Sequence, residues 1–138
     1  MSAVNNAAMP RGISNKNPGN IRLTNIVWSG QVTGTDPDYV TFTDPKWGIR
    51  AIVKIFRIYQ QKWGIRTIGG ACARWAPAAD DNDTLAYAAD VSRRCLVTPD
   101  QEVDFEKMWP AIVKAIIWHE NGMQPYDDAT INKGISLA

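Results

Sequence analysis

The sequence predicts a single domain, residues 1–138, with a mostly helical α+β fold. Apolar residues recur at the three- and four-residue spacing of an amphipathic helix in 49–63 and again in 105–117. In 25–48, by contrast, strand-forming runs alternate with turn residues. With 138 residues, of which 45% are hydrophobic, the chain is long enough to bury one core.

The first third of the chain is expected to hold loops and a small β element. Residues 1–12 carry no periodic pattern and are predicted to be loosely ordered. The cluster Asn17-Pro18-Gly19-Asn20 is typical of a tight turn. The segment 25–48 combines the run "YVTFT" with Gly and Asp-Pro turn signals, which predicts a small β-hairpin or meander.

Helical patterns dominate the chain after residue 48. The first predicted helix begins near residue 49 and ends at Gly64, a residue type that favours helix C-termini. A short helix is expected in 67–77, ended by Pro77. The next helix is expected in 80–96, where acidic residues at the start can cap the exposed backbone N–H groups.

A last long helix is predicted in 98–122. Thr98 or Asp100 can cap its start, Pro110 can divide it in two, and Gly122 suits its C-terminal end. Residues 125–138 are predicted to form a loop with a weak final turn.

Charge and composition narrow the classes of function. Fifteen basic and fourteen acidic residues give a net charge of +1, which argues against strong binding to nucleic acid or to an anionic membrane. The chain has no apolar run long enough to span a membrane and no secretory signal at its start, so no membrane insertion is expected. Cys72 and Cys95 predict two free thiols, with a single disulfide as the alternative.

Several common site types do not fit the sequence. A Gly-rich phosphate loop and an EF-hand loop are both missing, and one His with two separated Cys does not make a zinc site. No metal and no organic cofactor is therefore expected. An amidase or endopeptidase is disfavoured because neither Cys has a clear partner in His119.

Glu120 is the carboxylate with the most distinctive setting. It ends an apolar helix, where desolvation favours the neutral carboxylic acid over the charged form. A protonated acid of this kind can give its proton to a leaving oxygen, so Glu120 is the candidate general acid. The alternative is an ordinary solvated Glu.

His119 lies one residue earlier, so its side chain diverges from that of Glu120 by about 100° on a helix. It is expected to be a surface or packing residue.

Five segments in order resemble a known family. "RGISNKNPGNIR", "WSG", "YVTFTDPKWGIRA", "RWAPAADDNDTLAYAADV" and "AIIWHENGMQPY", the last followed by "INKGI", are similar to phage muralytic enzymes with a lysozyme-like fold. That family includes the virion lytic enzyme of cystoviruses and many endolysins of tailed phages. The resemblance runs from about Arg11 to Ile135 and implies that 1–138 is one lysozyme-like catalytic domain.

A second likeness concerns the order of the parts. "AIIWHENGMQPY" is similar to the segment that carries the catalytic Glu in lytic transglycosylases and goose-type lysozymes. In those families a Gly-containing cleft stretch follows the Glu, whereas the matching "SNKNPGNIR" precedes Glu120 here. The resemblance therefore implies a circular permutation, with the Glu helix moved from the front of the chain to the back.

The resemblance also implies a set of substrate-binding residues. The polar ones at the turn belong to the wall opposite Glu120, although their alternative role is to hold the loop through Asx-turn hydrogen bonds. The aromatic ones can stack on sugar rings or pack in the core. The predicted residues are Asn17, Asn20, Arg22, Trp28, Trp75, Tyr87, Asn121 and Tyr126.

A second catalytic group is less clear in the sequence. Asp38, beside "YVTFT", is the candidate for the second carboxylate of a glycosidase. Without one, the resemblance implies lytic-transglycosylase chemistry, in which a single Glu serves as acid and then base. Either reaction cuts the β-1,4 bond between N-acetylmuramic acid and N-acetylglucosamine.

The expected function is that of a phage endolysin or virion lysin acting on bacterial peptidoglycan. A muramidase and a lytic transglycosylase both remain open. The protein is expected to act as a monomer, either held in the host cytoplasm until it is released to the periplasm at lysis or carried in the virion. The alternative is a non-catalytic virion structural protein or peptidoglycan-binding protein with the same fold.

Overall fold

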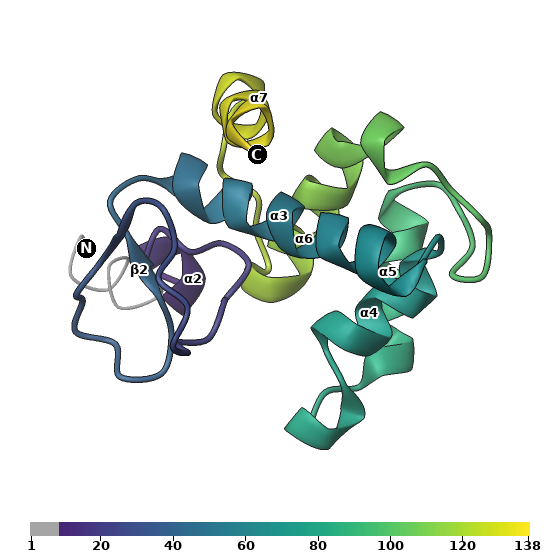
Figure 1. The fold of residues 1–138 in the computed structure, drawn as a ribbon, viewed down its shortest axis with the longest axis horizontal. Coiled ribbons are helices and arrows are strands. Elements are labelled where there is room, and N and C mark those ends of the chain that lie inside the picture. The colour runs from purple at the N-terminus through teal and green to yellow at the C-terminus, as the bar shows by residue number, and fades with distance from the viewer. Residues whose placement is uncertain (1–8) are drawn as a thin grey trace.

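Helix α3 (Pro45–Trp63) runs through the middle of the protein, and the other elements surround it (Figure 1). The structure is a computed structural model that describes residues 9–138. Helix α2 (Arg11–Ser14) and the small sheet lie at one end of α3, and helices α4 (Ile68–Trp75) and α5 (Thr84–Arg94) lie at the other. The mostly helical α+β class is confirmed.

The sequence of α3 explains both of its ends. The Asp44 side chain accepts a hydrogen bond from the Lys46 amide at 2.9 Å, and Pro45 occupies the first turn, where a missing N–H is harmless. Gly64 ends the helix in the left-handed conformation, with φ of 64°. The predicted helix is confirmed, but it begins four residues earlier than the apolar pattern suggested. Its buried face holds Ile49, Ile52, Val53 and Phe56.

The predicted β element is a two-stranded antiparallel sheet. Strand β1 (Gln31–Val32) pairs with β2 (Thr41–Phe42), with Gln31 opposite Phe42 and Val32 opposite Thr41. The prediction that residues 1–12 are loosely ordered is wrong for Arg11 and Gly12, which belong to the short helix α2 (Arg11–Ser14), and residues 1–8 lie outside the described part of the chain.

Helices α4 and α5 begin and end close to the residues that the sequence predicted. Helix α4 begins after Thr67, whose hydroxyl accepts a hydrogen bond from Gly70 N, and it ends before Pro77. A 3₁₀ turn, η1 (Ala78–Asp80), leads to α5. The Asp83 side chain caps α5 by accepting from Ala86 N at 3.0 Å, as predicted for the acidic cluster.

Both cysteines are free thiols in the interior, which confirms the first of the two alternatives. Burial raises the pKa of Cys72 to about 12, with a smaller contribution from Cys95. Burial likewise raises the pKa of Cys95 to about 11. Both groups are therefore neutral, unreactive thiols near pH 7.

The predicted helix over 98–122 is shorter than expected. Only a 3₁₀ turn, η2 (Phe105–Lys107), and helix α6 (Trp109–Asn121) are helical. Pro110 lies in the first turn of α6, so it marks the start of the helix and does not divide a longer one. The prediction that Thr98 or Asp100 caps this helix is wrong, because the chain from 98 to 104 is not helical.

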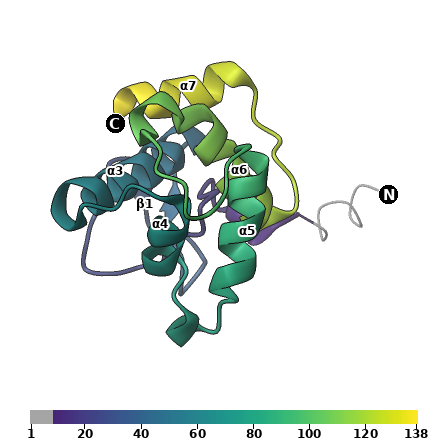
Figure 2. The same cartoon turned by 90° about the vertical axis from the view of Figure 1, so that its right-hand side faces the viewer.

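The C-terminal segment is a helix, α7 (Asp128–Leu137), where a loop was predicted. Asp127 caps it by accepting from the Thr130 amide at 2.9 Å and from the Thr130 hydroxyl at 2.7 Å. Helix α7 packs across the start of α3, and both views show the two helices together (Figures 1 and 2). Its buried residues are Ile131 and Gly134, too few to give a clear apolar period.

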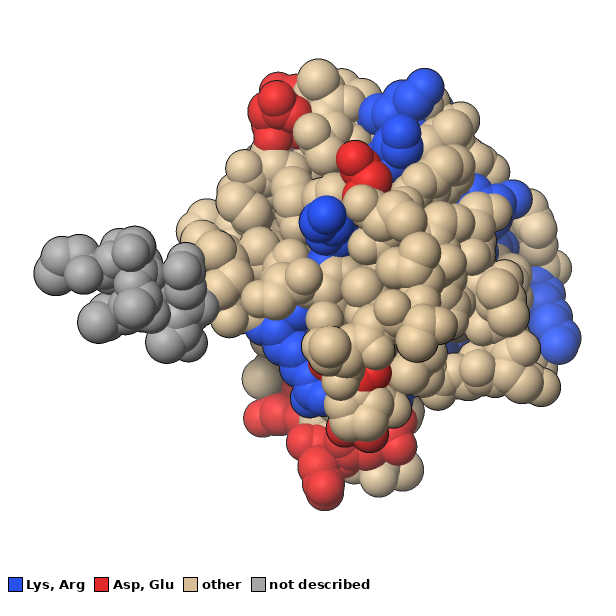
Figure 3. All heavy atoms as spheres, turned by 90° about the vertical axis from the view of Figure 1, so that its left-hand side faces the viewer, with Lys and Arg blue, Asp and Glu red and all other residues tan. Residues whose placement is uncertain are grey.

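The charged groups do not form a single field on the face seen in Figure 3. Basic and acidic side chains both occur there, several of them next to each other, and residues of other kinds cover most of the face. This agrees with the net charge of +1. Within residues 9–138, no helix has both the length and the apolar character needed to cross a membrane.

The contact between α7 and α3 gives a stability prediction. A Cβ on Gly134 would lie 2.5 Å from the Ile49 Cβ and 2.9 Å from the Lys46 backbone oxygen, so the helices would have to separate. Gly134→Ala should lower the free energy of unfolding by about 1–3 kcal/mol in urea. Asn132→Ala, at an exposed position of α7, is the matched control and should change it by less than about 0.5 kcal/mol.

Candidate active site

A cleft of about 340 Å³ opens beside the end of α6. One set of lining residues is polar and another is aromatic or aliphatic, so the cleft can hold a molecule that has both hydroxyl groups and flat apolar faces. The polar set contains Asn20, Arg22, Thr24, Asp80, Asn82 and Glu120. The apolar set contains Ile26, Trp28, Ile55, Ile58, Tyr59 and Trp75.

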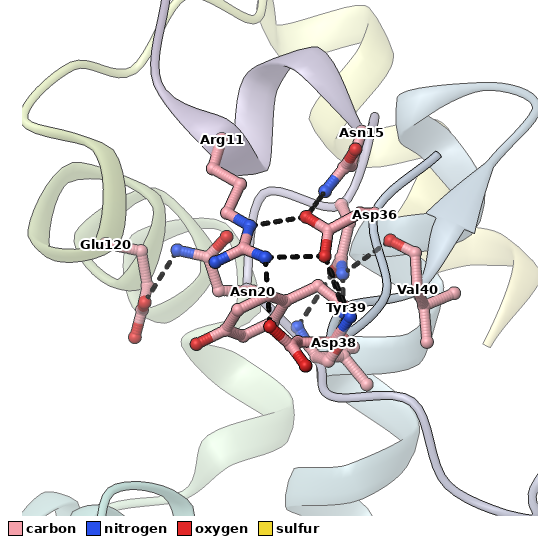
Figure 4. A network of polar contacts seen from close by, with 10 residues as sticks. Arg11, Asn15, Asn20, Asp36, Asp38, Tyr39, Val40 and Glu120 are labelled. Carbon is pink, nitrogen blue, oxygen red and sulfur yellow. Dashed lines mark hydrogen bonds and ion pairs between the residues drawn. The ribbon is translucent and has the colours of Figure 1, made fainter. Parts of the chain in front are cut away.

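Glu120 lies in the last turn of α6 and presents its carboxyl group to this cleft. Both of its oxygens accept a hydrogen bond. The Asn20 amide donates to Oε1 at 3.0 Å (Figure 4), and the Tyr87 hydroxyl donates to Oε2 at 2.7 Å. The two donors come from residues 100 and 33 positions away, so the tertiary fold holds the carboxyl group in one orientation.

Tyr87 is itself oriented by a further donor. Trp75 Nε1 donates to the Tyr87 oxygen at 2.9 Å, and because the indole N–H can only donate, the Tyr87 proton is left for Glu120. Burial, and then the charge of Glu120, raises the pKa of Tyr87 well above its usual value. Tyr87 therefore keeps its proton and remains a donor throughout the neutral pH range.

Asn20 reaches Glu120 from the N-terminal turn, so it lies beside Glu120 and not in the opposite wall as predicted. Its backbone is left-handed, with φ of 50°, a conformation that Asn adopts more readily than most residues. Asn121 ties the same turn to α6, because its amide donates to Pro18 O at 2.8 Å and to Ile117 O at 3.0 Å. Neighbouring residues of α6 thus hold the turn and present the acid.

Gly12 of α2 allows this close approach. A Cβ on Gly12 would lie 2.5 Å from Asn121 Oδ1 and 2.7 Å from Asn20 Oδ1. Within residues 9–138 neither oxygen has a hydrogen-bond partner. A larger residue at position 12 would push on both amides, and through Asn20 on the group that contacts Glu120.

Asn17 does not belong to the cleft wall. Its side chain is fully buried, and its amide donates to Ile21 O and Val40 O, both at 2.9 Å. Its oxygen accepts from Ile21 N at 3.0 Å. With its amide bound to the backbone on both sides, Asn17 holds the loop, which was the alternative role, and is not available to a ligand.

The other predicted binding residues either line the cleft, support it from behind or, in the case of Tyr126, lie away from it. Arg22, Trp28 and Trp75 line the cleft together with Asn20. Tyr87 and Asn121 lie behind it, where they hold Glu120 and the N-terminal turn.

Tyr126 is placed away from the cleft lining. Its half-buried ring packs against the core, and burial, with a smaller effect from Asp44, raises its pKa to about 12. Within the described chain its hydroxyl has no hydrogen-bond partner. We therefore assign it to packing and not to substrate binding.

The carboxylate that shares the cleft with Glu120 is Asp80, not the predicted Asp38. Asp38 is largely exposed and lies 3.4 Å from the Arg11 guanidinium, outside the lining of the cleft. Asp80 ends the 3₁₀ turn η1, and its carboxylate caps none of the helices in residues 9–138. Its position between Trp75 and Tyr87 in the sequence was the one signal that could have pointed to it.

A surface network supports the loop that carries Tyr39. Arg11 forms an ion pair with Asp36, and Asn15 donates to the same carboxylate at 2.9 Å (Figure 4). The hydrogen bond from Arg11 is the main cause that holds the pKa of Asp36 well below its usual value. The network joins α2 to the loop beside the cleft and places Tyr39 in the cleft lining.

His119 is a packing residue, as predicted. Its ring lies 3.9 Å from the Tyr87 ring, measured between centroids, and its Nδ1 lies 2.8 Å from an Asp90 oxygen. Asp90 also pairs with Arg93 and Arg94. His119 therefore packs against the ring of Tyr87, and its hydrogen bond goes to Asp90 and not to Glu120.

No metal site is evident in the part of the chain that the structure describes. Among residues 9–138, no group of three or more His, Cys, Asp or Glu side chains is arranged to hold a metal ion.

Comparison with known proteins identifies a relative. The chain is 37% identical over 135 residues to Protein P5 of Pseudoalteromonas phage PM2, a match that covers 95% of this chain and 82% of that protein. The chain belongs to the family of this phage protein. The predicted link to bacteriophages is confirmed at this level. No model of a protein family matches the chain.

The two tyrosines give a matched pair for testing the geometry around Glu120. Tyr87→Phe removes the donor to Glu120 and leaves Trp75 Nε1 without its acceptor, so it should lower the free energy of unfolding by about 1–3 kcal/mol. Tyr126→Phe removes a hydroxyl that has no hydrogen-bond partner among the described residues, so it should be neutral or stabilising. Urea unfolding of both variants measures the difference, and equal effects would contradict the hydrogen bonds assigned to Tyr87.

Proposed function

We propose that this protein cleaves the glycan strands of bacterial peptidoglycan, with Glu120 as general acid. The observation that carries the proposal is a carboxyl group held by two donors at the wall of a cleft that also contains indole and phenol rings. Sugars match such a lining, because their hydroxyl groups bind polar side chains and their ring faces pack on aromatic rings. The phage relative supports a bacterial target.

The reaction needs a proton on the leaving oxygen. Glu120 donates its proton to the glycosidic oxygen, the bond from that oxygen to C1 breaks, and positive charge develops on the sugar ring. The carboxylate left behind is stabilised by the Asn20 amide and the Tyr87 hydroxyl, which are already in place to donate to it.

The fate of C1 distinguishes the two chemistries. In a muramidase, water adds to C1 and gives its proton to a carboxylate, leaving a reducing end. In a lytic transglycosylase, the C6 hydroxyl of the same muramic acid residue adds to C1 and returns its proton to Glu120, leaving a 1,6-anhydro end. Both reactions cut the β-1,4 bond and need no cofactor.

The contact between the N-terminal turn and α6 supports the lysozyme-like and permuted interpretation of the fold. Asn20 and Glu120 are 100 residues apart, yet they form one side of the site. A cleft stretch placed before the Glu helix in the chain therefore lies beside it in space, as a circular permutation requires. We propose a monomeric endolysin or virion lysin, acting from the host cytoplasm at lysis or from the virion at entry.

Digestion of purified peptidoglycan tests the proposal. The wild type should release soluble muropeptides, and Glu120→Gln, which keeps the shape but not the acid, should be slower by at least about 100-fold. Mass spectrometry of the products separates reducing ends from 1,6-anhydro ends. A wild type that binds peptidoglycan but releases nothing would contradict the proposal and favour the non-catalytic alternative.

Glu106→Gln is the matched control for this experiment. Glu106 lies outside the cleft lining and pairs with Arg57 at 2.8 Å on the surface. Its substitution should leave the cleavage rate within about twofold of the wild type, since an exposed ion pair contributes about 0–1 kcal/mol to stability and nothing to the chemistry.

Asp80 provides a separate test of the second carboxylate. If Asp80 activates the attacking water, Asp80→Asn should reduce the release of reducing ends by about 100-fold or more. Asp81→Asn is the control, because Asp81 is adjacent and exposed but outside the cleft lining. Full activity of Asp80→Asn, together with 1,6-anhydro products, would contradict a role for Asp80 as base and assign both proton transfers to Glu120.

A further inference from the structure

Arg22 is the one basic side chain among the described residues that line the cleft. The other ionisable acid–base groups in the lining are the carboxyl groups of Glu120 and Asp80 and the phenol groups of Tyr39 and Tyr59. A neutral glycan can use this guanidinium only as a hydrogen-bond donor to its oxygens, and its charge stays unpaired. A negatively charged glycan would be repelled by the carboxylates of Glu120 and Asp80, and a cation at a fixed place in the cleft would offset that repulsion.

Arg22 is held in position without being neutralised. Its backbone pairs with Tyr39 in an isolated antiparallel bridge, and its guanidinium lies 5.1 Å from the centroid of the Tyr39 ring. No carboxylate of residues 9–138 forms an ion pair with it. Stacking on an aromatic ring restrains the guanidinium while leaving its N–H donors free.

A second arginine on the same ring provides the contrast. The Arg11 guanidinium lies 4.4 Å from the Tyr39 centroid, but Asp36 and Asp38 pair with it. Figure 4 shows Arg11 engaged by these two carboxylates beside Tyr39. Of the two cations on the ring, Arg11 is therefore used within the protein, and Arg22 is the one left for a ligand that enters the cleft.

We propose that Arg22 binds a carboxylate carried by the glycan and so selects an acidic glycan strand over a neutral one. This inference rests on the proposed function. A guanidinium can donate two parallel hydrogen bonds to a carboxylate, which fixes direction as well as position. Arg22 then determines which sugar lies at its end of the cleft and how the strand runs past Glu120.

Peptidoglycan offers that carboxylate in two places. One is the lactyl group of muramic acid, which is free when the sugar carries no peptide. The other is the peptide stem, which ends in free carboxylates. Both give the same contact with Arg22, and a neutral polymer of N-acetylglucosamine offers neither.

Binding of soluble glycans to the Glu120→Gln variant tests the proposal without turnover. The probes are a muropeptide tetrasaccharide with free stem carboxylates, the same compound with these groups methyl-esterified, the stem-free tetrasaccharide with free lactyl groups, and a neutral N-acetylglucosamine tetramer. Calorimetry on Glu120→Gln should give about tenfold tighter binding of an acidic probe than of the neutral tetramer. Higher salt should reduce the difference.

The same titrations on two double variants identify the residue responsible. Adding Arg22→Gln should abolish the preference for the acidic probe and leave binding of the neutral tetramer within about twofold. Adding Arg66→Gln, an exposed arginine outside the cleft lining, should leave the preference intact. If methyl esterification of the stem carboxylates removes the tighter binding, Arg22 contacts the peptide stem. If the stem-free tetrasaccharide still binds more tightly than the neutral tetramer, Arg22 contacts the lactyl group.

Two failures have different meanings. Equal binding of acidic and neutral probes, or a preference that survives Arg22→Gln, overturns the role of Arg22 and leaves the proposed cleavage reaction standing. No binding of any glycan to Glu120→Gln, together with no cleavage of peptidoglycan by the wild type, overturns the proposed function itself.

Discussion

The candidate site depends on one contact, the hydrogen bond from the Asn20 amide to the carboxyl group of Glu120. It joins a turn near the start of the chain to the end of a helix near its finish, and the Asn121 amide strengthens the junction by donating to Pro18 O. Without this junction the turn and α6 would form separate surfaces. With it, they form adjoining parts of one cleft, and hydrogen bonds from Asn20 and Tyr87 hold the Glu120 carboxyl group at its wall.

Most of the surrounding structure makes that junction rigid. The fully buried Asn17 fixes the backbone of the turn, and Gly12 lets α2 approach the two amides from outside. On the other side, Trp75 orients the Tyr87 hydroxyl toward Glu120. These supports come from four separate parts of the chain, so the geometry of the acid is a property of the whole fold and not of a local motif. Such preorganisation is what an acid catalyst requires.

The sequence predicted the elements that local chemistry determines. The apolar period of α3, the caps at Asp83 and Gly122 and the alternation in "YVTFT" all gave correct elements. Helix α7 escaped prediction because a glycine, Gly134, takes the place of an apolar side chain where the helix meets α3, which leaves no clear stripe. For the same reason the sequence alone does not predict that a larger side chain at Gly134 would lower the stability.

The candidate site was predictable in its centre but not in its surroundings. The end of an apolar helix indicated Glu120, and the turn residues indicated Asn20. The sequence did not distinguish Asn17, which faces the interior, from Asn20, which faces the cleft. It also indicated Asp38 and not Asp80 as the second carboxylate, because the set of side chains that line one cleft depends on the tertiary fold. The most direct test of the account is a crystal structure of Glu120→Gln with a peptidoglycan tetrasaccharide. We expect the glycosidic oxygen within about 3 Å of the substituted side chain, and a strand bound elsewhere would contradict the assignment of Glu120.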